Sequence, residues 1–175
     1  MPVARYHPLL VTLHWVLALA IIGNLAVGKL LLEGLANVDP AKPDLLRLHM
    51  ASGLTILVLM VLRLVTRVRS RKPASVNASG PLKWLATTSH WGLYLLTFAM
   101  LSTGLGMAQM GALFPILEGK SVTLPSSFSQ LAPHAGHVLF SSLLLALIAL
   151  HSIAALWHAF GKRDKIFSRM WYGAR

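Results

Sequence analysis

The sequence contains no cysteine, and this absence limits the chemistry open to the protein. Without thiols there can be no disulfide, no thiolate zinc site, no iron–sulfur cluster and no covalently attached c-type haem. Any transition-metal site must therefore depend on the eight histidines.

Charged residues are also scarce. They make up 12% of the 175 residues, whereas 55% are hydrophobic, and an ordinary soluble domain has roughly 25% charged residues. The charges cluster between long apolar runs. This pattern predicts a protein dissolved in a bilayer, folded as a single domain over residues 1–175 with no room for a separate soluble domain.

Acidic residues are few, and the net charge is +11. Such an excess can indicate nucleic-acid binding, but here the basic residues bracket hydrophobic segments and do not alternate with aromatic residues. We therefore predict no nucleic-acid partner and interpret the basic residues as loops beside anionic membrane lipid.

Four apolar stretches, at about 9–32, 49–68, 84–108 and 135–160, are each long enough to span a membrane. Proline and glycine mark the connections between them as loops. The first stretch contains a sequence that resembles a signal-peptide cleavage site, Ala18-Leu19-Ala20, but it continues well beyond it. The predicted fold is therefore an all-α, four-helix transmembrane bundle.

The distribution of lysine and arginine predicts the orientation. Four basic residues fall on one side of the predicted membrane, Lys29, Lys42, Arg47 and Lys120. Eleven fall on the side of the termini: Arg5, Arg67, Arg69, Arg71, Lys72, Lys83, Lys162, Arg163, Lys165, Arg169 and Arg175. By the positive-inside rule both termini are expected to be cytoplasmic.

The fourth stretch carries two histidines with an informative spacing. His137 and His151 are 14 residues apart, so they share a helix face to within about 40° and differ in depth by about 21 Å. Histidine is costly in a bilayer unless it is paired or binds a ligand. This spacing is the one needed to hold two stacked haems along one helix.

Each of these histidines needs a partner at its own depth. His49, at the start of the second stretch, is level with His137, and His14, in the first, is nearer the level of His151. His90 and His158 also lie at the inner side, and spacing alone excludes neither as the inner axial ligand. Both are equally suited to give a hydrogen bond or a proton to a quinone.

One face of the second stretch supports this interpretation. Gly53 follows His49 by one turn, where a missing side chain lets a flat macrocycle approach. The same face continues through Ile56 and Met60 to Arg63, at the inner histidines' depth. We interpret Arg63 as a counter-ion for haem propionates or a quinone head-group, the alternative being a side chain that extends to the cytoplasmic interface.

With these residues in place, the chain resembles the bacterial cytochrome b561 family of small dihaem membrane cytochromes. The resemblance depends on an ordered set of segments: Thr12-Leu13-His14-Trp15, Leu48-His49 followed by Gly53, the run 56–64 that ends Leu62-Arg63-Leu64, His90 before Leu93-Tyr94-Leu95-Leu96, His137, Leu150-His151 and His158. The loop 109–133 shows little that matches.

The resemblance implies two haem b groups, with His14 and His151 as axial ligands of the inner haem and His49 and His137 of the outer one. It also implies a ubiquinone site near the inner side, where we place His90 and His158, in a multi-pass protein of the bacterial inner membrane.

The implied activity is electron transfer from periplasmic superoxide to ubiquinone. An anionic substrate favours a positive outer surface, yet the four outer basic residues are balanced by Glu33, Asp39, Asp44 and Glu118. The alternative is an electron-relay subunit that links a partner dehydrogenase or hydrogenase to the quinone pool. A third class, a haem-free carrier or structural protein, requires four intramembrane histidines to be aligned by chance.

Overall fold

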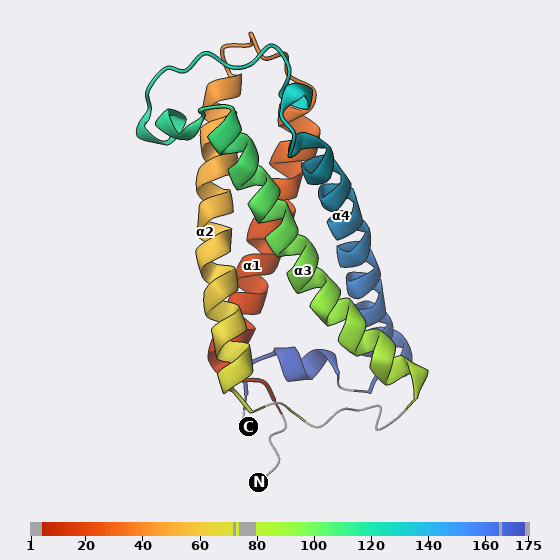
Figure 1. The fold of residues 1–175 in the computed structure, drawn as a ribbon. Helices are drawn as coiled ribbons and strands as arrows, with labels where there is room; N and C mark the ends of the chain where they lie inside the picture. Colours follow the sequence, from red (N-terminus) through yellow and green to blue (C-terminus); the bar gives the residue numbers. More distant parts are fainter. Residues whose placement is uncertain (1–4, 72, 74–79, 165, 174–175) are drawn as a thin grey trace.

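The computed structural model describes residues 5–71, 73, 80–164 and 166–173. Four long helices form an elongated bundle (Figure 1). They are α1 (Pro8–Ala26), which continues as the π-helix η1 (Val27–Leu32), α2 (Lys42–Arg69), α3 (Pro81–Met110), and α4 (His134–Leu156), which continues as the π-helix η4 (Trp157–Lys162). The predicted all-α, four-helix fold is confirmed.

All four helices are long and apolar enough to cross a membrane. Several large apolar side chains point outward from them, and Leu19 and Leu30 are each 75% exposed. Because a soluble protein rarely exposes contiguous apolar surface of this kind, these faces are suited to contact lipid. The four-span membrane bundle expected from the sequence is therefore consistent with the structure.

Both ends of the described chain lie at the same end of the bundle (Figure 1). We call this the inner end, following the orientation predicted from the basic residues, and the opposite one the outer end. Three residues used in that prediction, Lys72, Lys165 and Arg175, lie outside the described residues. The cytoplasmic location of the termini stays a prediction.

The second helix is longer than the sequence predicted. It begins at Lys42 and not near residue 49, so His49 lies two turns inside it. Pro43 lies in a stretch that the sequence predicts to be a loop, but it occupies the first helical turn, where a proline loses no helical hydrogen bond. The third helix likewise begins at a proline, Pro81, three residues earlier than expected.

The connection 109–133, expected to be a plain loop, contains two short 3₁₀ helices, η2 (Phe114–Glu118) and η3 (Phe128–Gln130). It packs against the ends of α1 and α2 through a buried cluster that includes Leu32, Leu46 and Ile116. This cluster closes the outer end of the bundle.

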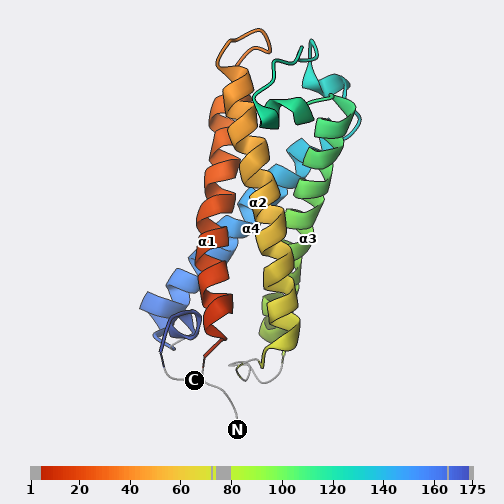
Figure 2. The same cartoon turned by 90° about the vertical axis from the view of Figure 1, so that its left-hand side faces the viewer.

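The helices associate as two pairs. Helix α1 packs along α2 and α3 packs along α4, whereas α1 and α4 have few contacts. Figure 2 shows α4 crossing behind α1 and α2. A second buried cluster joins α1, α2 and α3, and its members are Leu13, Leu17, Ile56, Met60 and Tyr94. Ile56 and Met60 belong to it, which confirms that the face below His49 is directed into the bundle.

Candidate functional site

Two histidines from different helix pairs face each other near the outer end. His49 on α2 and His137 on α4 have ring centres 6.2 Å apart, with their planes at 75°. Two imidazoles that bind one metal ion from opposite sides, through bonds of about 2 Å each, have ring centres roughly 6 Å apart. The two rings are therefore separated by the distance that one six-coordinate haem iron requires.

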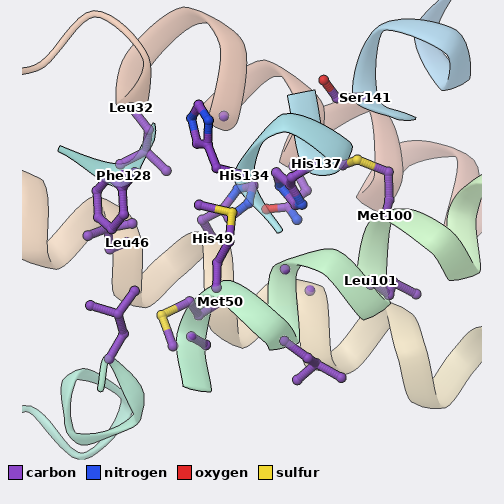
Figure 3. A pocket seen from close by; sticks show the side chains of 18 of the residues that line it. Leu32, Leu46, His49, Met50, Met100, Leu101, Phe128, His134, His137 and Ser141 are labelled. Carbon is purple, nitrogen blue, oxygen red and sulfur yellow. The ribbon is translucent and has the colours of Figure 1, made fainter. Parts of the chain in front are cut away.

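A cavity of about 430 Å³ surrounds this pair. Its walls are mostly apolar and come from all four helices, and His134 also lines it (Figure 3). Gly53 also lines it. A largely apolar cavity of a few hundred Å³ with a few polar groups is typical of a cofactor site.

Two glycines that the sequence pattern did not predict for this site bring the helices close to these rings. A Cβ atom at Gly28 would lie 3.3 Å from His49 Cε1, and one at Gly104 would lie 3.2 Å from His137 Cε1. Each imidazole ring thus packs against the backbone of a neighbouring helix at a glycine, where there is no side chain. The sequence signal was a glycine within an apolar run, but nothing in it indicated which histidine each glycine would meet.

A second group of histidines meets near the inner end. The ring centres of His14 on α1 and His151 on α4 are 6.3 Å apart at an interplanar angle of 74°. His90 on α3 approaches the same ring, with its centre 5.6 Å from that of His151. The structure thus brings His14 and His151 together, and it leaves His90 as a geometric alternative to His14.

Arg63 projects toward this inner group. Its Cζ lies 5.5 Å from the centre of the Tyr94 ring, and Arg63 Nε and Tyr94 Oη are both buried with no hydrogen-bond partner among the described residues. A buried guanidinium N–H or phenol hydroxyl without a hydrogen-bond partner destabilises the fold. These two groups fit an anionic or carbonyl-bearing ligand, whereas a side chain extended to the interface would leave Nε in water.

His158 lies apart from the other inner histidines. Among the described residues, no ring contact joins it to His14, His90 or His151; instead its Nδ1 lies 2.5 Å from Asp164 Oδ2. Asp164 is a residue that the sequence pattern did not predict for this site. The chain reverses direction at Arg163, which has a φ of 53°, and no pattern indicated that this turn would bring the carboxylate back onto η4.

Four apolar spans that carry facing imidazole pairs define a class of protein, the membrane-embedded cytochromes that hold haem between histidine side chains. The model of one family, prokaryotic cytochrome b561, matches residues 5–173. The chain therefore belongs to the prokaryotic cytochrome b561 family, a family of haem b proteins.

Three curated relatives cover nearly the whole chain. The probable superoxide oxidase CybB of Yersinia pestis is 28% identical over 95% of this chain and 95% of its own length. Cytochrome b561 homolog 2 of Escherichia coli is 26% identical over 95% of this chain and 90% of its own. Cytochrome b562 of Cereibacter sphaeroides is 28% identical over 94% of each chain.

Proposed function

We propose that this protein is a superoxide:ubiquinone oxidoreductase of the bacterial inner membrane that holds two haem b groups. The observation that carries the proposal is the pairing of histidines at both ends of α4. The ring centres are 6.2 Å apart for His49 and His137 and 6.3 Å apart for His14 and His151. Haem, when bound, supplies one-electron redox chemistry. The protein supplies its position, its surroundings and access for protons.

The histidine pairs set two depths in the membrane. His137 and His151 are 14 residues apart on one helix, about 21 Å along its axis. Each histidine pair connects α4 to one helix of the α1–α2 pair: to α2 at the outer end and to α1 at the inner end. One polypeptide therefore links an outer redox site to an inner one.

The outer end would receive superoxide. Two of its basic residues already form ion pairs. Lys29 Nζ lies 3.4 Å from Glu33 Oε2, and Lys120 Nζ lies 2.5 Å from Glu118 Oε2. Lys42 differs from them. It lines the cavity and is 5% exposed. Among the described residues it forms no ion pair; its ammonium group donates to the Leu35 carbonyl and lies 5.5 Å from the centre of the Phe128 ring. A local cation at the cavity thus supports anion entry although the outer surface as a whole is balanced.

The inner end would reduce ubiquinone. Two superoxide ions leave as two molecules of oxygen, and their two electrons with two protons convert ubiquinone to ubiquinol. Arg63 would bind the haem propionates or the quinone head-group, and His90 and His158 would give a hydrogen bond or a proton to the quinone. The name of the Yersinia pestis relative supports this reaction.

A second candidate is an electron relay that connects a partner dehydrogenase or hydrogenase to quinone. Two relatives are named simply as cytochromes, b561 homolog 2 and b562, which favours this alternative. Both candidates share the haem sites and differ only in the electron donor.

The deciding experiment measures ubiquinol formation by purified protein in liposomes that contain ubiquinone, with superoxide generated outside. We expect ubiquinol to form faster than in protein-free liposomes, and we expect His137→Ala to abolish the acceleration. An unchanged rate with a protein that holds two haems, measured as the pyridine haemochrome, would exclude the oxidase and favour the relay.

A further inference from the structure

The hydroxyl group of Thr103 contacts the back of the His137 ring. Thr103 Oγ1 lies 3.1 Å from His137 Nδ1, and it also lies 2.9 Å from the carbonyl oxygens of both Ala99 and Met100. Thr103 is on α3 and His137 is on α4, so this contact is set by the packing of the two helices.

The neighbouring carbonyl groups favour one direction for this hydrogen bond. A threonine hydroxyl has one hydrogen and accepts through its lone pairs, whereas a backbone carbonyl can only accept. A hydroxyl hydrogen directed to a carbonyl of the preceding turn of α3 leaves the oxygen free to accept a hydrogen bond. In that arrangement His137 Nδ1–H donates to Thr103 Oγ1, and Nε2 is left unprotonated to bind a metal ion.

We infer that Thr103 is a positioning residue for the outer metal site, one that selects the tautomer of His137 and tunes the electron density at Nε2. The inference rests on the proposed ligation of haem by His137. A hydrogen bond from the distal nitrogen of a ligating imidazole makes the ligating nitrogen more basic. A more basic ligand stabilises the oxidised iron and so lowers the reduction potential.

The other outer histidine lacks an equivalent hydroxyl contact among the described residues. His49 Nδ1 is buried with no hydrogen-bond partner among the described residues. The Ser52 hydroxyl lies 2.7 Å from Asn24 Oδ1 and 2.8 Å from the Leu48 carbonyl oxygen, and among the described residues it has no hydrogen bond to the His49 ring. The two sides of the outer site therefore differ in their side-chain contacts: among the described residues, a hydroxyl group contacts Nδ1 of His137 but not Nδ1 of His49.

The test compares Thr103→Val, which removes the hydroxyl at nearly constant shape, with Thr103→Ser, which keeps it. Thr97→Val is the matched control, because Thr97 lies on the same helix and its hydroxyl donates to the Leu93 carbonyl at 2.7 Å and to no histidine among the described residues. Two readouts are used on each purified protein. They are a redox titration of both haems and the low-temperature EPR spectrum of the oxidised protein.

We expect Thr103→Val to make the potential of one haem more positive, with a several-fold rise in its reduced-to-oxidised ratio at fixed potential and altered EPR g-values. The other haem should be unaffected, and Thr103→Ser and Thr97→Val should match the unmutated protein. If Thr103→Val loses the outer haem, a Thr103→Ser variant that keeps it at the normal potential still supports the inference.

Three results would overturn it: an unchanged potential and spectrum in a haem-replete Thr103→Val variant, the same shift in Thr103→Ser, or the same shift in Thr97→Val. Failure of the proposed function is distinguishable from all three. It would appear in the unmutated protein, as fewer than two haems per chain or as two haems with no superoxide-dependent ubiquinol formation.

Discussion

His158 and Asp164 form a close pair at the inner end of the bundle, with 2.5 Å between Nδ1 and Oδ2. The other carboxylate oxygen of Asp164 accepts a hydrogen bond from the Ile166 N–H at 3.2 Å. Loss of solvent raises the pKa of the Asp164 carboxyl, but the hydrogen bonds from His158 and Ile166 and the nearby charge of Lys162 outweigh it, so the pKa lies below its usual value. The carboxylate is therefore charged throughout the neutral range and holds the orientation of His158.

Replacement of Asp164 should separate proton supply from haem binding. We expect Asp164→Asn to lower the rate of ubiquinone reduction several-fold while the protein keeps its full haem content, because His158 loses the acceptor that orients it. Asp44→Asn, the same change at an exposed site of the outer end, is the control. Equal rates in the two variants would show that the pair takes no part in the reaction.

Acid should weaken this pair in a definite direction. The pKa of Asp164 is lower in the folded protein than in the unfolded chain, so the pair stabilises the fold at pH above the ordinary aspartate pKa of about 3.9. That contribution is lost as the pH falls through the lower, folded pKa. The difference in thermal stability between the unmutated protein and Asp164→Asn should therefore be present at pH 7 and should vanish in strong acid.

The two candidates for the inner axial ligand can be distinguished by haem content. We expect His14→Ala to remove one haem of the two, and His90→Ala to keep both, because the 6.3 Å separation of His14 and His151 fits ligands on opposite sides of one metal ion. The pyridine haemochrome gives the number of haems per chain. The reverse result, haem loss in His90→Ala alone, would assign His90 as the ligand and free His14.

Gly104 should be required for the position of the His137 ring. A Cβ there would lie 3.2 Å from His137 Cε1, whereas one at Gly23 would have nothing within 4 Å. We expect Gly104→Ala to displace the ring and lower the occupancy of the outer haem. Gly23→Ala should keep full occupancy and stabilise its helix by up to about 1 kcal/mol. Haem content and thermal unfolding of both variants check this prediction, and full outer-haem occupancy in Gly104→Ala would contradict it.

Trp15 should anchor the C-terminal segment to α1. Its Nε1 donates to the Met170 carbonyl at 3.0 Å, and its ring contacts those of Phe167 and Trp171. We expect Trp15→Phe to lose the hydrogen bond but keep much of the ring packing, at a cost of about 1 kcal/mol. Faster proteolysis of the C-terminal segment should accompany it. Trp84→Phe, at a site that is 74% exposed, should change neither property.

The sequence by itself determined the four apolar helices and the depths of the histidines within them. Hydrophobic run length reports directly on membrane spans, and the rise of a helix fixes how far apart His137 and His151 lie along α4. The same periodicity placed Ile56 and Met60 on the face of α2 that is directed into the bundle, and both are buried.

Only the tertiary structure decided how those helices are rotated and what each histidine touches. Helical period is a local property, whereas the contacts of Gly28 with His49, Thr103 with His137 and His90 with His151 depend on how two helices pack. The sequence also did not predict that α2 begins at Lys42 or that Asp164 contacts His158. The first follows from a proline that a helix tolerates in its first turn, and the second follows from one left-handed residue, Arg163, whose conformation no pattern in the chain indicated.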